Sequence, residues 1–443
     1  MYILLDSFAN TSLPLQNTLN ETGTECNYLV LNDDRFLPLG FISMFDFIID
    51  SVSPLPDSFH DVYLPCVKIP HYYSLLPYNT LYYNIHHLGQ KKGLVWFRHD
   101  SKELCADRIE RLDENGKLVC QDYYNRYGFI AYSDFYDEEN EAISRCYYSS
   151  DNKPILNYSY RTDSYCLFRS SKTVLTFVGK DALISYCLFL LHLHGESIIP
   201  TSYSQITLLK QANILDRQAK FFLFQSAEDY HKYMNEPSLH RESQTILLMN
   251  NESTKDYIKT MSEPTHVLRY IGKNNRILPP RQQALTLTRS DQIECLAELA
   301  QTNPHITFHV AAYTMVSPTL LSYEKYKNIK IHPSISFQKL QELLSISSFY
   351  LDINYYNEAY DSIVSAASTP LLLMGFKDTL HNPDYILPEY IFPEGDHVSF
   401  AKALHQLSTD QALYLNHLNR QLEDNRKTFG ILKTLLTECE TIS

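Results

Sequence analysis

Residues 349–374 read FYLDINYYNEAYDSIVSAASTPLLLM, and this stretch alternates between two kinds of apolar pattern. Phe349–Ile353 is a short apolar run that predicts a buried strand. Asp361–Ser368 is predicted to be a helix, and Pro370–Met374 is a second short apolar run that predicts a buried strand. A strand, a helix and a strand in succession form the repeating unit of a parallel α/β domain. We therefore expect an α/β fold in this part of the chain.

The neighbouring sequence extends this unit into a domain that covers residues 279–443. The prolines of Leu278-Pro279-Pro280 mark a linker in front of it. Further strands are predicted at Ala284–Thr288, Ile306–Val310 and Ile329–Ile331. Helices are predicted from a cap at Ser290 to about Ala300, from a cap at Ser336 over Phe337–Leu344, and over most of His397–Leu436.

The N-terminal part predicts a second α/β domain of the same kind. Tyr2–Leu5 and Asn27–Leu31 are predicted strands, and Ser12–Thr22 between them is a predicted helix that stops near Gly23. Helices and strands alternate again from about Leu175 to Val267. We assign residues 1–62 and 170–278 to this first Rossmann-like lobe.

The segment between these two parts has a different pattern. From about Tyr63 to Arg169, short runs rich in Tyr, Val, Ile and Phe are separated by turn signals, of which Asn115-Gly116 is the clearest. This spacing is typical of consecutive β-hairpins, and we expect an antiparallel sheet domain over residues 63–169. The predicted fold class is therefore α/β, with two Rossmann-like lobes and an inserted antiparallel β-sheet. This is the two-lobed architecture called GT-B.

The composition excludes several classes of protein. The 443 residues carry a formal net charge of −13, which argues against nucleic-acid binding. The nine cysteines form no CxxC pair, which is typical of free thiols in a reducing compartment. We see no signal peptide and no apolar run of about 20 residues, so we expect a cytoplasmic protein. The 34 tyrosines are also unusual, and they offer either sheet packing or a broad amphipathic contact surface.

Two blocks of the sequence resemble a known family. Residues 30–43 read VLNDDRFLPLGFIS, and residues 112–117 read LDENGK, followed by QDYYNRYGF at residues 121–129. These blocks are similar to those of the accessory Sec system glycosylation chaperones, the GtfB-type stabilising subunits of a peptide O-GlcNAc transferase. Here Tyr124 and Phe129 replace the usual His-like and Trp-like members. Residues 284–291, ALTLTRSD, look like the opening strand of the family's second lobe.

The resemblance implies both a fold and a role. It implies the GT-B fold with an inserted extended sheet, and a hetero-oligomer with a catalytic glycosyltransferase subunit. In such a complex the partner carries the chemistry, and this subunit stabilises it and engages a serine-rich repeat adhesin before export. It also implies a location at the membrane surface, which the low isoelectric point would leave to its partners.

The residues that would bind a sugar nucleotide are incomplete. A retaining GT-B enzyme typically uses two carboxylates spaced Glu-x7-Glu, and here Glu358 fits the first position while Ala366 stands at the second. Such an enzyme also uses an Arg and a Lys five residues apart to neutralise the diphosphate. Here Arg289 is followed by Glu294. We therefore expect no bound cofactor and no catalytic residue, with Arg289 and Glu358 as remnants of a donor site.

Two other functions stay open at this point. The chain could be an active UDP-sugar-dependent transferase in which Glu358 and Arg289 make altered donor contacts. It could also be a scaffold that stabilises its partner without contacting the acceptor.

The inserted sheet supplies the candidate acceptor contacts: Tyr123, Tyr124, Arg126, Tyr127 and Phe129. An extended serine-rich acceptor offers few anchors, so aromatic faces and main-chain hydrogen bonds would bind it. About half of the tyrosines in this segment are expected simply to pack the sheet.

The residues Asn32, Asp33 and Asp34 follow a predicted strand. They form either a Mg²⁺ site or a structural turn, and we favour the turn and predict no metal.

Overall fold

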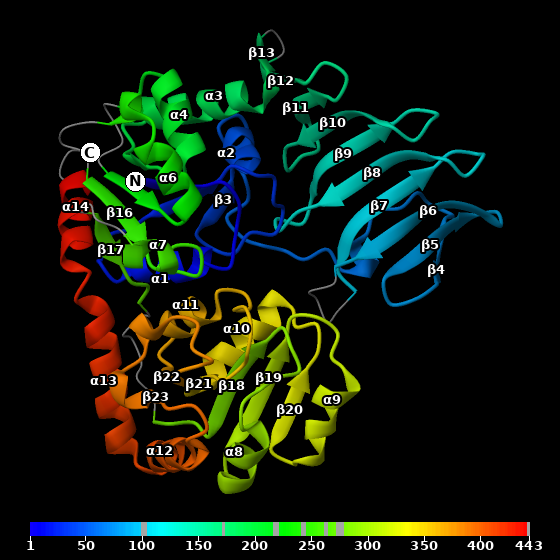
Figure 1. Ribbon diagram of the computed structural model, residues 1–443. Helices are drawn as coiled ribbons and strands as arrows, with labels where there is room; N and C mark the ends of the chain where they lie inside the picture. The colour runs from blue at the N-terminus through cyan, green and yellow to red at the C-terminus, as the bar shows by residue number, and fades with distance from the viewer. Residues whose placement is uncertain are drawn as a thin grey trace.

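The computed structural model describes residues 1–98, 104–170, 173–215, 221–240, 245–260, 265–271 and 279–440. Figure 1 shows two α/β lobes, one above the other, and a long curved sheet that projects from the upper lobe. The predicted α/β, GT-B-like fold with an inserted antiparallel sheet is confirmed. No helix in the described ranges combines the length and the apolar character that crossing a membrane requires.

The first lobe is built on parallel strands. The sheet order is β14-β1-β2-β3, and a second group has the order β15-β16-β17. The backbone N–H of Leu223 in β15 donates to Pro200 O, one residue after β14, which joins the two groups edge to edge. The strands are β1 (Tyr2–Leu5), β2 (Asn27–Val30), β3 (Phe41–Ser43), β14 (Ile198–Ile199), β15 (Phe221–Phe224), β16 (Thr245–Met249) and β17 (His266–Leu268). The helices are α1 (Ser12–Asn20), α2 (Met44–Asp50), α3 (Gly179–Leu193), α4 (Tyr203–Gln211), α6 (Ala227–Met234) and α7 (Lys255–Thr260).

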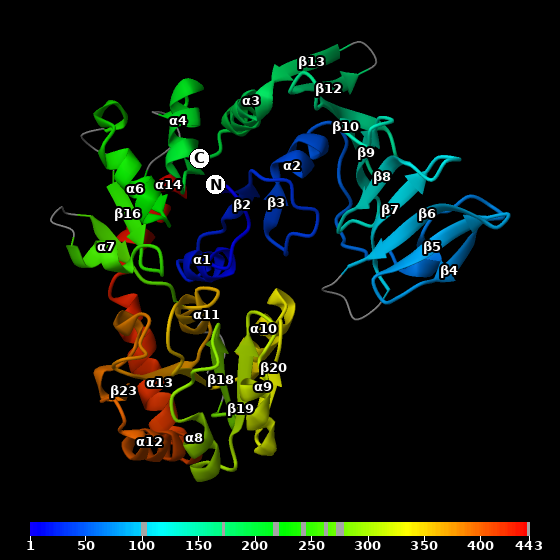
Figure 2. The ribbon, with the colours of Figure 1, turned by 45° about the vertical axis from the view of Figure 1, so that its right-hand side comes forward.

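The inserted sheet is a ten-stranded antiparallel meander in which each strand pairs with the next one along the chain. Its strands are β4 (Ser74–Pro77), β5 (Tyr82–His87), β6 (Gln90–Phe97), β7 (Ala106–Leu112), β8 (Leu118–Tyr124), β9 (Ile130–Tyr136), β10 (Ala142–Tyr148), β11 (Pro154–Ser159), β12 (Ser164–Ser170) and β13 (Thr173–Val178). Figure 2 shows β12 and β13 next to α3, with β4 at the far edge. The expected boundary at residue 169 therefore falls inside the last hairpin, because β13 pairs with β12 and carries the sheet to Val178.

The second lobe has a parallel sheet in the order β20-β19-β18-β21-β22-β23. Its strands are β18 (Gln283–Thr288), β19 (Thr307–Ala312), β20 (Ile329–His332), β21 (Phe349–Asp352), β22 (Leu372–Phe376) and β23 (Ile391–Phe392). Its helices are α8 (Leu296–Thr302), α9 (Pro318–Leu321), α10 (Phe337–Ile346), α11 (Ser362–Ala367), α12 (His397–Thr409), α13 (Gln411–Arg426) and α14 (Gly430–Glu440). Ser336 caps α10 as expected, since its side chain accepts from Lys339 N.

The helix expected from a cap at Ser290 begins later. Its first residue is Leu296, after the backbone N–H of Glu294 has donated to Ile353 O and Ile293 has bridged to Asn354. The Ser290 N–H donates to the Thr288 hydroxyl instead of entering a helix. The segment is held extended by the end of β21, a contact that the local sequence does not reveal.

The two lobes are firmly joined. One apolar core runs through both of them and includes Ile3 in β1 and Leu285 in β18. The C-terminal helices cross back from the second lobe to the first, along the left side of Figure 1. Arg426 in α13 contacts Glu21 beside α1 at 3.1 Å, and Arg269 contacts Asp424 at 3.2 Å.

Candidate donor and acceptor sites

Glu358, the expected sugar-side carboxylate, is buried and bonded to its own helix. Its Oε1 accepts from Ile363 N at 2.7 Å and from the Ser362 hydroxyl at 3.2 Å, so it serves the first turn of α11. Burial, together with a hydrogen bond to Glu252 of the first lobe, raises the pKa of Glu358 to about 8. A largely protonated carboxyl that already accepts two hydrogen bonds is poorly suited to binding sugar hydroxyls.

Ala366 stands where a ribose-binding carboxylate is expected. It lies in α11, and all six residues of this helix are buried. An alanine side chain accepts no hydrogen bond. The position therefore contributes packing only.

Arg289 and Glu294 do not form a cationic pair. Arg289 is exposed after β18, and its guanidinium lies 4.9 Å from the Tyr313 ring. Glu294 accepts from the Tyr355 hydroxyl at 2.7 Å and contacts His397 Nε2. Burial works against ionisation of Glu294, but these two hydrogen bonds outweigh it and lower the pKa of Glu294. An ionised carboxylate therefore stands where the diphosphate would need a cation.

The two lobes also contact each other directly, through the loop after β16 and the segment after β22. The Asn250 side-chain amide donates to Asp384 at 2.8 Å, and the Tyr385 hydroxyl donates to Asn250 O at 2.6 Å. The Lys255 ammonium donates to His381 O at 2.8 Å. His381 in turn forms a buried ion pair with Asp352, with Nδ1 and Oδ1 at 2.6 Å. These bonds hold the loop after β16 against the second lobe.

The residues Asn32, Asp33 and Asp34 make hydrogen bonds that connect the loop after β2 to the inserted sheet and to α3. Asp33 accepts from the Arg145 guanidinium at 3.1 Å and from the Tyr147 hydroxyl at 3.0 Å, both on the inserted sheet. The Lys180 ammonium donates to Asn32 at 2.6 Å. The Asp34 carboxylate accepts from Phe36 N, which is the expected turn. Among the described residues no group of three or more His, Cys, Asp or Glu side chains is placed to hold a metal ion.

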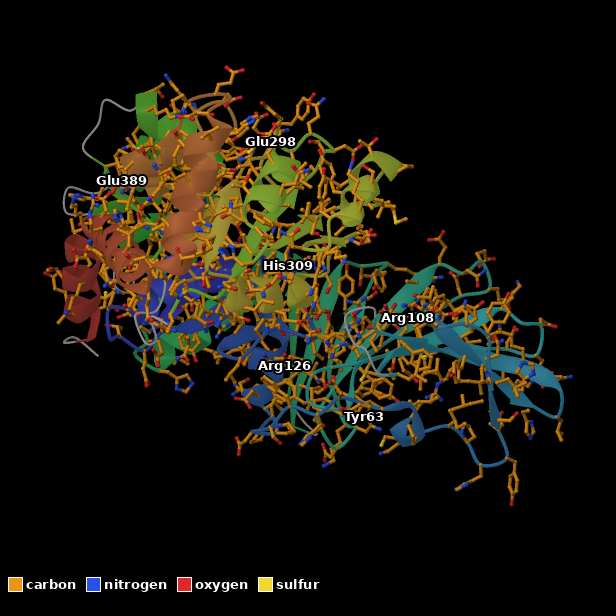
Figure 3. The ribbon with its side chains drawn as sticks, turned by 90° about the horizontal axis from the view of Figure 1, so that it is seen from below. Tyr63, Arg108, Arg126, Glu298, His309 and Glu389 are labelled. Carbon is orange, nitrogen blue, oxygen red and sulfur yellow. The ribbon has the colours of Figure 1, made fainter. Side chains whose placement is uncertain are left out.

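The two sequence blocks that carry the resemblance contact each other. Arg126 Nη1 donates to Leu37 O at 2.7 Å and to Pro38 O at 3.0 Å, and the Arg126 backbone N–H donates to Arg35 O. In the other direction, Arg35 Nη1 donates to Tyr124 O of the sheet at 2.7 Å. We call this set of contacts between residues 33–38 and the sheet the joint. Figure 3 shows Arg126 where the sheet meets the first lobe, with Arg108 farther out on the sheet.

The five candidate acceptor residues do not form one surface. Tyr124, Tyr127 and Phe129 line a cavity of about 480 Å³, which we call the aromatic cavity. Residues of the segment His60–Lys68 line the same cavity, and this segment hydrogen-bonds to the sheet, with His60 N donating to Arg126 O. Arg126 lines a smaller neighbouring cavity of about 220 Å³ and holds the joint.

Tyr123 lies on the other face of the sheet, because successive strand residues alternate. There it belongs to a row of side chains that face each other across neighbouring strands. Trp96 and Arg108 in this row carry no functional signal in the local sequence, and only the strand pairing reveals that they lie beside Tyr123. The row consists of Tyr82, Trp96, Arg108, Tyr123, Tyr132 and Tyr147.

Sequence reasoning also missed Arg35 and Arg145, although both lie at the joint. Arg145 forms a bidentate pair with Asp134 at 2.7 and 2.8 Å and stacks over the Tyr132 ring at 4.0 Å. Arg35 is part of a quoted block, but nothing in its local sequence shows that its partners are Asp107 and Tyr124.

The fold and these sites define a class: a GT-B-like protein in which three of the four expected donor positions are bonded within the chain or lack a polar group, and whose inserted sheet carries an aromatic cavity. Comparison with known proteins specifies this class further. A family model described as the GtfB middle domain matches residues 78–177, which lie within the inserted sheet. A second model, the GftB/GlyA-F C-terminal domain, matches residues 284–421 of the second lobe.

Curated relatives match most of the chain. The UDP-N-acetylglucosamine–peptide N-acetylglucosaminyltransferase stabilizing protein GtfB of Streptococcus pneumoniae is 25% identical over 407 residues, which cover 89% of each chain. The protein of that name from Limosilactobacillus reuteri is 25% identical and covers 98% of this chain and 100% of its own. The resemblance to GtfB-type stabilizing proteins is therefore confirmed.

Solved structures share the fold. A chain in the crystal structure of a GtfA/B complex bound to UDP and GlcNAc superposes with a TM-score of 0.63 at 22% identity. The match covers 97% of this chain and 96% of that chain. The GT-B-like arrangement with its insertion is thus common to both.

Proposed function

We propose that this chain is a non-catalytic subunit that stabilises a catalytic peptide O-GlcNAc transferase and binds the serine-rich polypeptide that the transferase modifies. One observation carries this proposal. Three of the four expected donor positions hold side chains that are bonded within the chain or lack a polar group, whereas the inserted sheet keeps an aromatic cavity. Relatives at 25% identity are named as stabilizing proteins of such a transferase, which supports the same role here.

The state of the donor positions supports the assignment of catalysis to the partner. A transferase must stabilise the charge that develops on the leaving diphosphate. At the two expected positions this chain has one exposed arginine and one carboxylate that is bonded to Tyr355 and His397. A single guanidinium with a carboxylate at the second position would neutralise a diphosphate poorly.

The aromatic cavity supports binding of an extended polypeptide. Phe129 stacks beside Tyr127 at a centroid distance of 6.1 Å, and both line the cavity together with residues of the segment His60–Lys68. The wall also carries polar groups, including Lys68 and Asp151, that can hydrogen-bond to a peptide backbone. An acceptor with small side chains would bury its backbone and methylene groups against the rings.

Titration of the purified chain with UDP-GlcNAc and then with a serine-rich repeat peptide tests this function. We expect peptide binding and no nucleotide binding up to about 1 mM. Nucleotide binding with a Kd of about 1 mM or tighter would mean that Arg289 and Glu358 still hold a donor, and the alternative of an active transferase would replace the proposal.

Co-expression with the catalytic subunit should increase the yield of soluble transferase.

Phe129→Ala is expected to weaken peptide binding by about tenfold, because it removes an aromatic wall of the cavity. Phe129 suits this test because, unlike Arg126 and Tyr127, it makes no side-chain hydrogen bond at the joint. Fluorescence anisotropy with a labelled peptide measures the change. Tyr72→Ala is the matched control, since Tyr72 is 94% exposed on the same domain and lies outside the cavity.

Phe129→Ala also distinguishes the proposed function from that of a scaffold that stabilises its partner without contacting the acceptor. The complex with the catalytic subunit should form equally well with Phe129→Ala and with the unaltered chain, as measured by gel filtration. If peptide affinity is unchanged while the complex forms, the cavity does not bind the acceptor, and the scaffold function is the better description.

A further inference from the structure

A second cavity lies beside the aromatic cavity on the inserted sheet. It measures about 180 Å³, and it is lined by residues 68–70 and Tyr73, which lead from the segment His60–Lys68 to β4, and by residues of β5, β6 and β7. Its lining is mainly aliphatic: Ile69, Pro70, Ile85, Ile109 and Leu112. We call it the aliphatic pocket.

The base of the aliphatic pocket belongs to the core of the sheet domain. Ile85 and Ile109 are 4% and 3% exposed and belong to one apolar cluster. Gly93 of β6 pairs with Ile85 on one side and with Arg111 on the other, and it has no side chain to fill the space between these two strands. The pocket is smaller than the ~300 Å³ at which small-molecule sites begin, so it suits one side chain of a larger ligand.

The mouth of the aliphatic pocket is positively charged. Lys68, Lys92 and Arg111 line the pocket, whereas none of the described residues that line it is acidic. The Arg111 guanidinium is neutralised by Asp122, to which its Nε donates at 2.8 Å. The Lys68 and Lys92 ammonium groups make no hydrogen bond or ion pair with another described residue. An acidic group next to the pocket would therefore meet two unpaired cations.

The aliphatic pocket and the aromatic cavity are close enough for one extended polypeptide to occupy both. Lys68 lines both of them. Ile109 pairs with Asp122, which is two residues before Tyr124, and Ile109 and Tyr124 belong to the same apolar cluster. Such diagonal neighbours in an antiparallel sheet lie about 7–8 Å apart. Alternate side chains of an extended chain lie about 7 Å apart, so they match this spacing.

We propose that the aliphatic pocket binds an aliphatic side chain of the acceptor polypeptide, next to an acidic residue, while nearby residues of the same polypeptide occupy the aromatic cavity. This inference rests on the proposed acceptor binding and deepens it, because it gives the acceptor a sequence preference. An aliphatic side chain gains free energy when it leaves water for a lining of isoleucine, leucine and proline. A carboxylate at the mouth is attracted by Lys68 and Lys92.

Four peptides test the proposal with the full-length chain. All are serine-rich, with either leucine or serine at the centre and either glutamate or glutamine on both sides of it. The leucine peptides should bind about tenfold more tightly than their serine twins, which is the effect of burying part of one such side chain. The glutamate peptides should bind about threefold more tightly than their glutamine twins, and added salt should remove this second advantage.

Substitutions at Ile69 should change the leucine advantage in a way that misfolding cannot imitate. Ile69 is half-buried in the lining, so Ile69→Phe fills the pocket and should abolish the advantage. Ile69→Ala enlarges the pocket and should make a phenylalanine peptide bind more tightly than the leucine peptide. Lys92→Gln should reduce the glutamate advantage and keep the leucine advantage. Val119→Phe is the control, because Val119 is 44% exposed on β8 and lines neither cavity.

The outcomes separate this inference from the proposed function. If the leucine and serine peptides bind equally well, or if the leucine advantage survives Ile69→Phe, the aliphatic pocket does not bind the acceptor, while acceptor binding itself stands. If glutamate gives no advantage over glutamine, the acidic neighbour, and with it the proposed occupant, is wrong. If no peptide binds at all, both the role of the pocket and the proposed acceptor binding are overturned.

Discussion

Replacing Arg145 with alanine is expected to lower the free energy of unfolding by about 3–5 kcal/mol, the usual cost of breaking a buried ion pair by removing one partner. Arg145 pairs with Asp134 on the sheet and with Asp33 of the first lobe, and these two carboxylates are 5% and 19% exposed. Without the guanidinium, both carboxylates lose their charged partner in a largely water-excluded setting. The Tyr132 ring also loses its stacking partner at 4.0 Å.

Chemical denaturation followed by circular dichroism measures this effect. Arg161→Ala is the matched control, because Arg161 belongs to the same domain and pairs with Asp137 at 3.6 Å in an exposed setting. It should change the stability by less than about 0.5 kcal/mol. A similarly small effect for Arg145→Ala would mean that the joint does not depend on this ion pair.

The second large effect concerns pH. Between pH 6.5 and 8 the free energy of unfolding is expected to fall by about 3 kcal/mol, because two buried groups between the lobes hold protons more tightly in the folded chain. Burial and the hydrogen bond to Glu252 raise the pKa of Glu358 to about 8. Burial alone would lower the pKa of His381, but the Asp352 carboxylate outweighs burial and raises it to about 9.

The direction of this pH effect on stability follows from the pKa values of Glu358 and His381. The ordinary pKa values of the two groups are 4.5 and 6.5, and both folded-state values lie above them. Each contribution is complete below the ordinary value and is lost as the pH rises through the folded-state value. At about 1.4 kcal/mol per proton and pH unit, each group loses about 1.5 kcal/mol over this range, because Glu358 is half deprotonated in the folded chain at pH 8 and His381 is half protonated in the unfolded chain at pH 6.5.

Glu358→Gln isolates one of the two groups. Glutamine keeps the acceptor oxygen for Ile363 N but does not titrate, so the fall in stability between pH 6.5 and 8 should be about half as large. Urea denaturation across the pH range measures it. Glu114→Gln, at an exposed turn, should leave the profile unchanged. An unaltered profile for Glu358→Gln would show that the carboxyl does not hold its proton in the folded chain.

Much of the fold could be predicted because its signals are local. The inserted sheet follows from short runs of Tyr, Val, Ile and Phe and from turn residues such as Asn115-Gly116, which lies between β7 and β8. The buried strand Phe221–Phe224 was missed, since four apolar residues without flanking signals resemble any buried segment. The helix expected at Ser290 was wrong because the end of β21 holds that segment extended.

The candidate sites were harder to predict, because their partners lie far apart in the sequence. Arg126 was expected at the acceptor, yet three of its donors go to Leu37, Pro38 and Tyr127. The two carbonyl partners lie almost 90 residues away along the chain, and backbone carbonyls leave no trace in a residue pattern. The aromatic cavity was only partly predictable, since the aromatic residues stand in one block while the segment that covers them comes from His60–Lys68.

The ten-stranded meander also determines the order in which the chain folds. Each of its strands pairs with its neighbour in sequence, so its contacts close short loops and form rapidly. The first lobe needs a distant pairing, that of Tyr2 in β1 with Ile198 in β14. Closing such a long loop carries a large entropy cost until the intervening chain is compact. We therefore expect the meander to fold first and to bring the two halves of the first lobe together, so that β1 pairs with β14 only after the whole insertion has been synthesised.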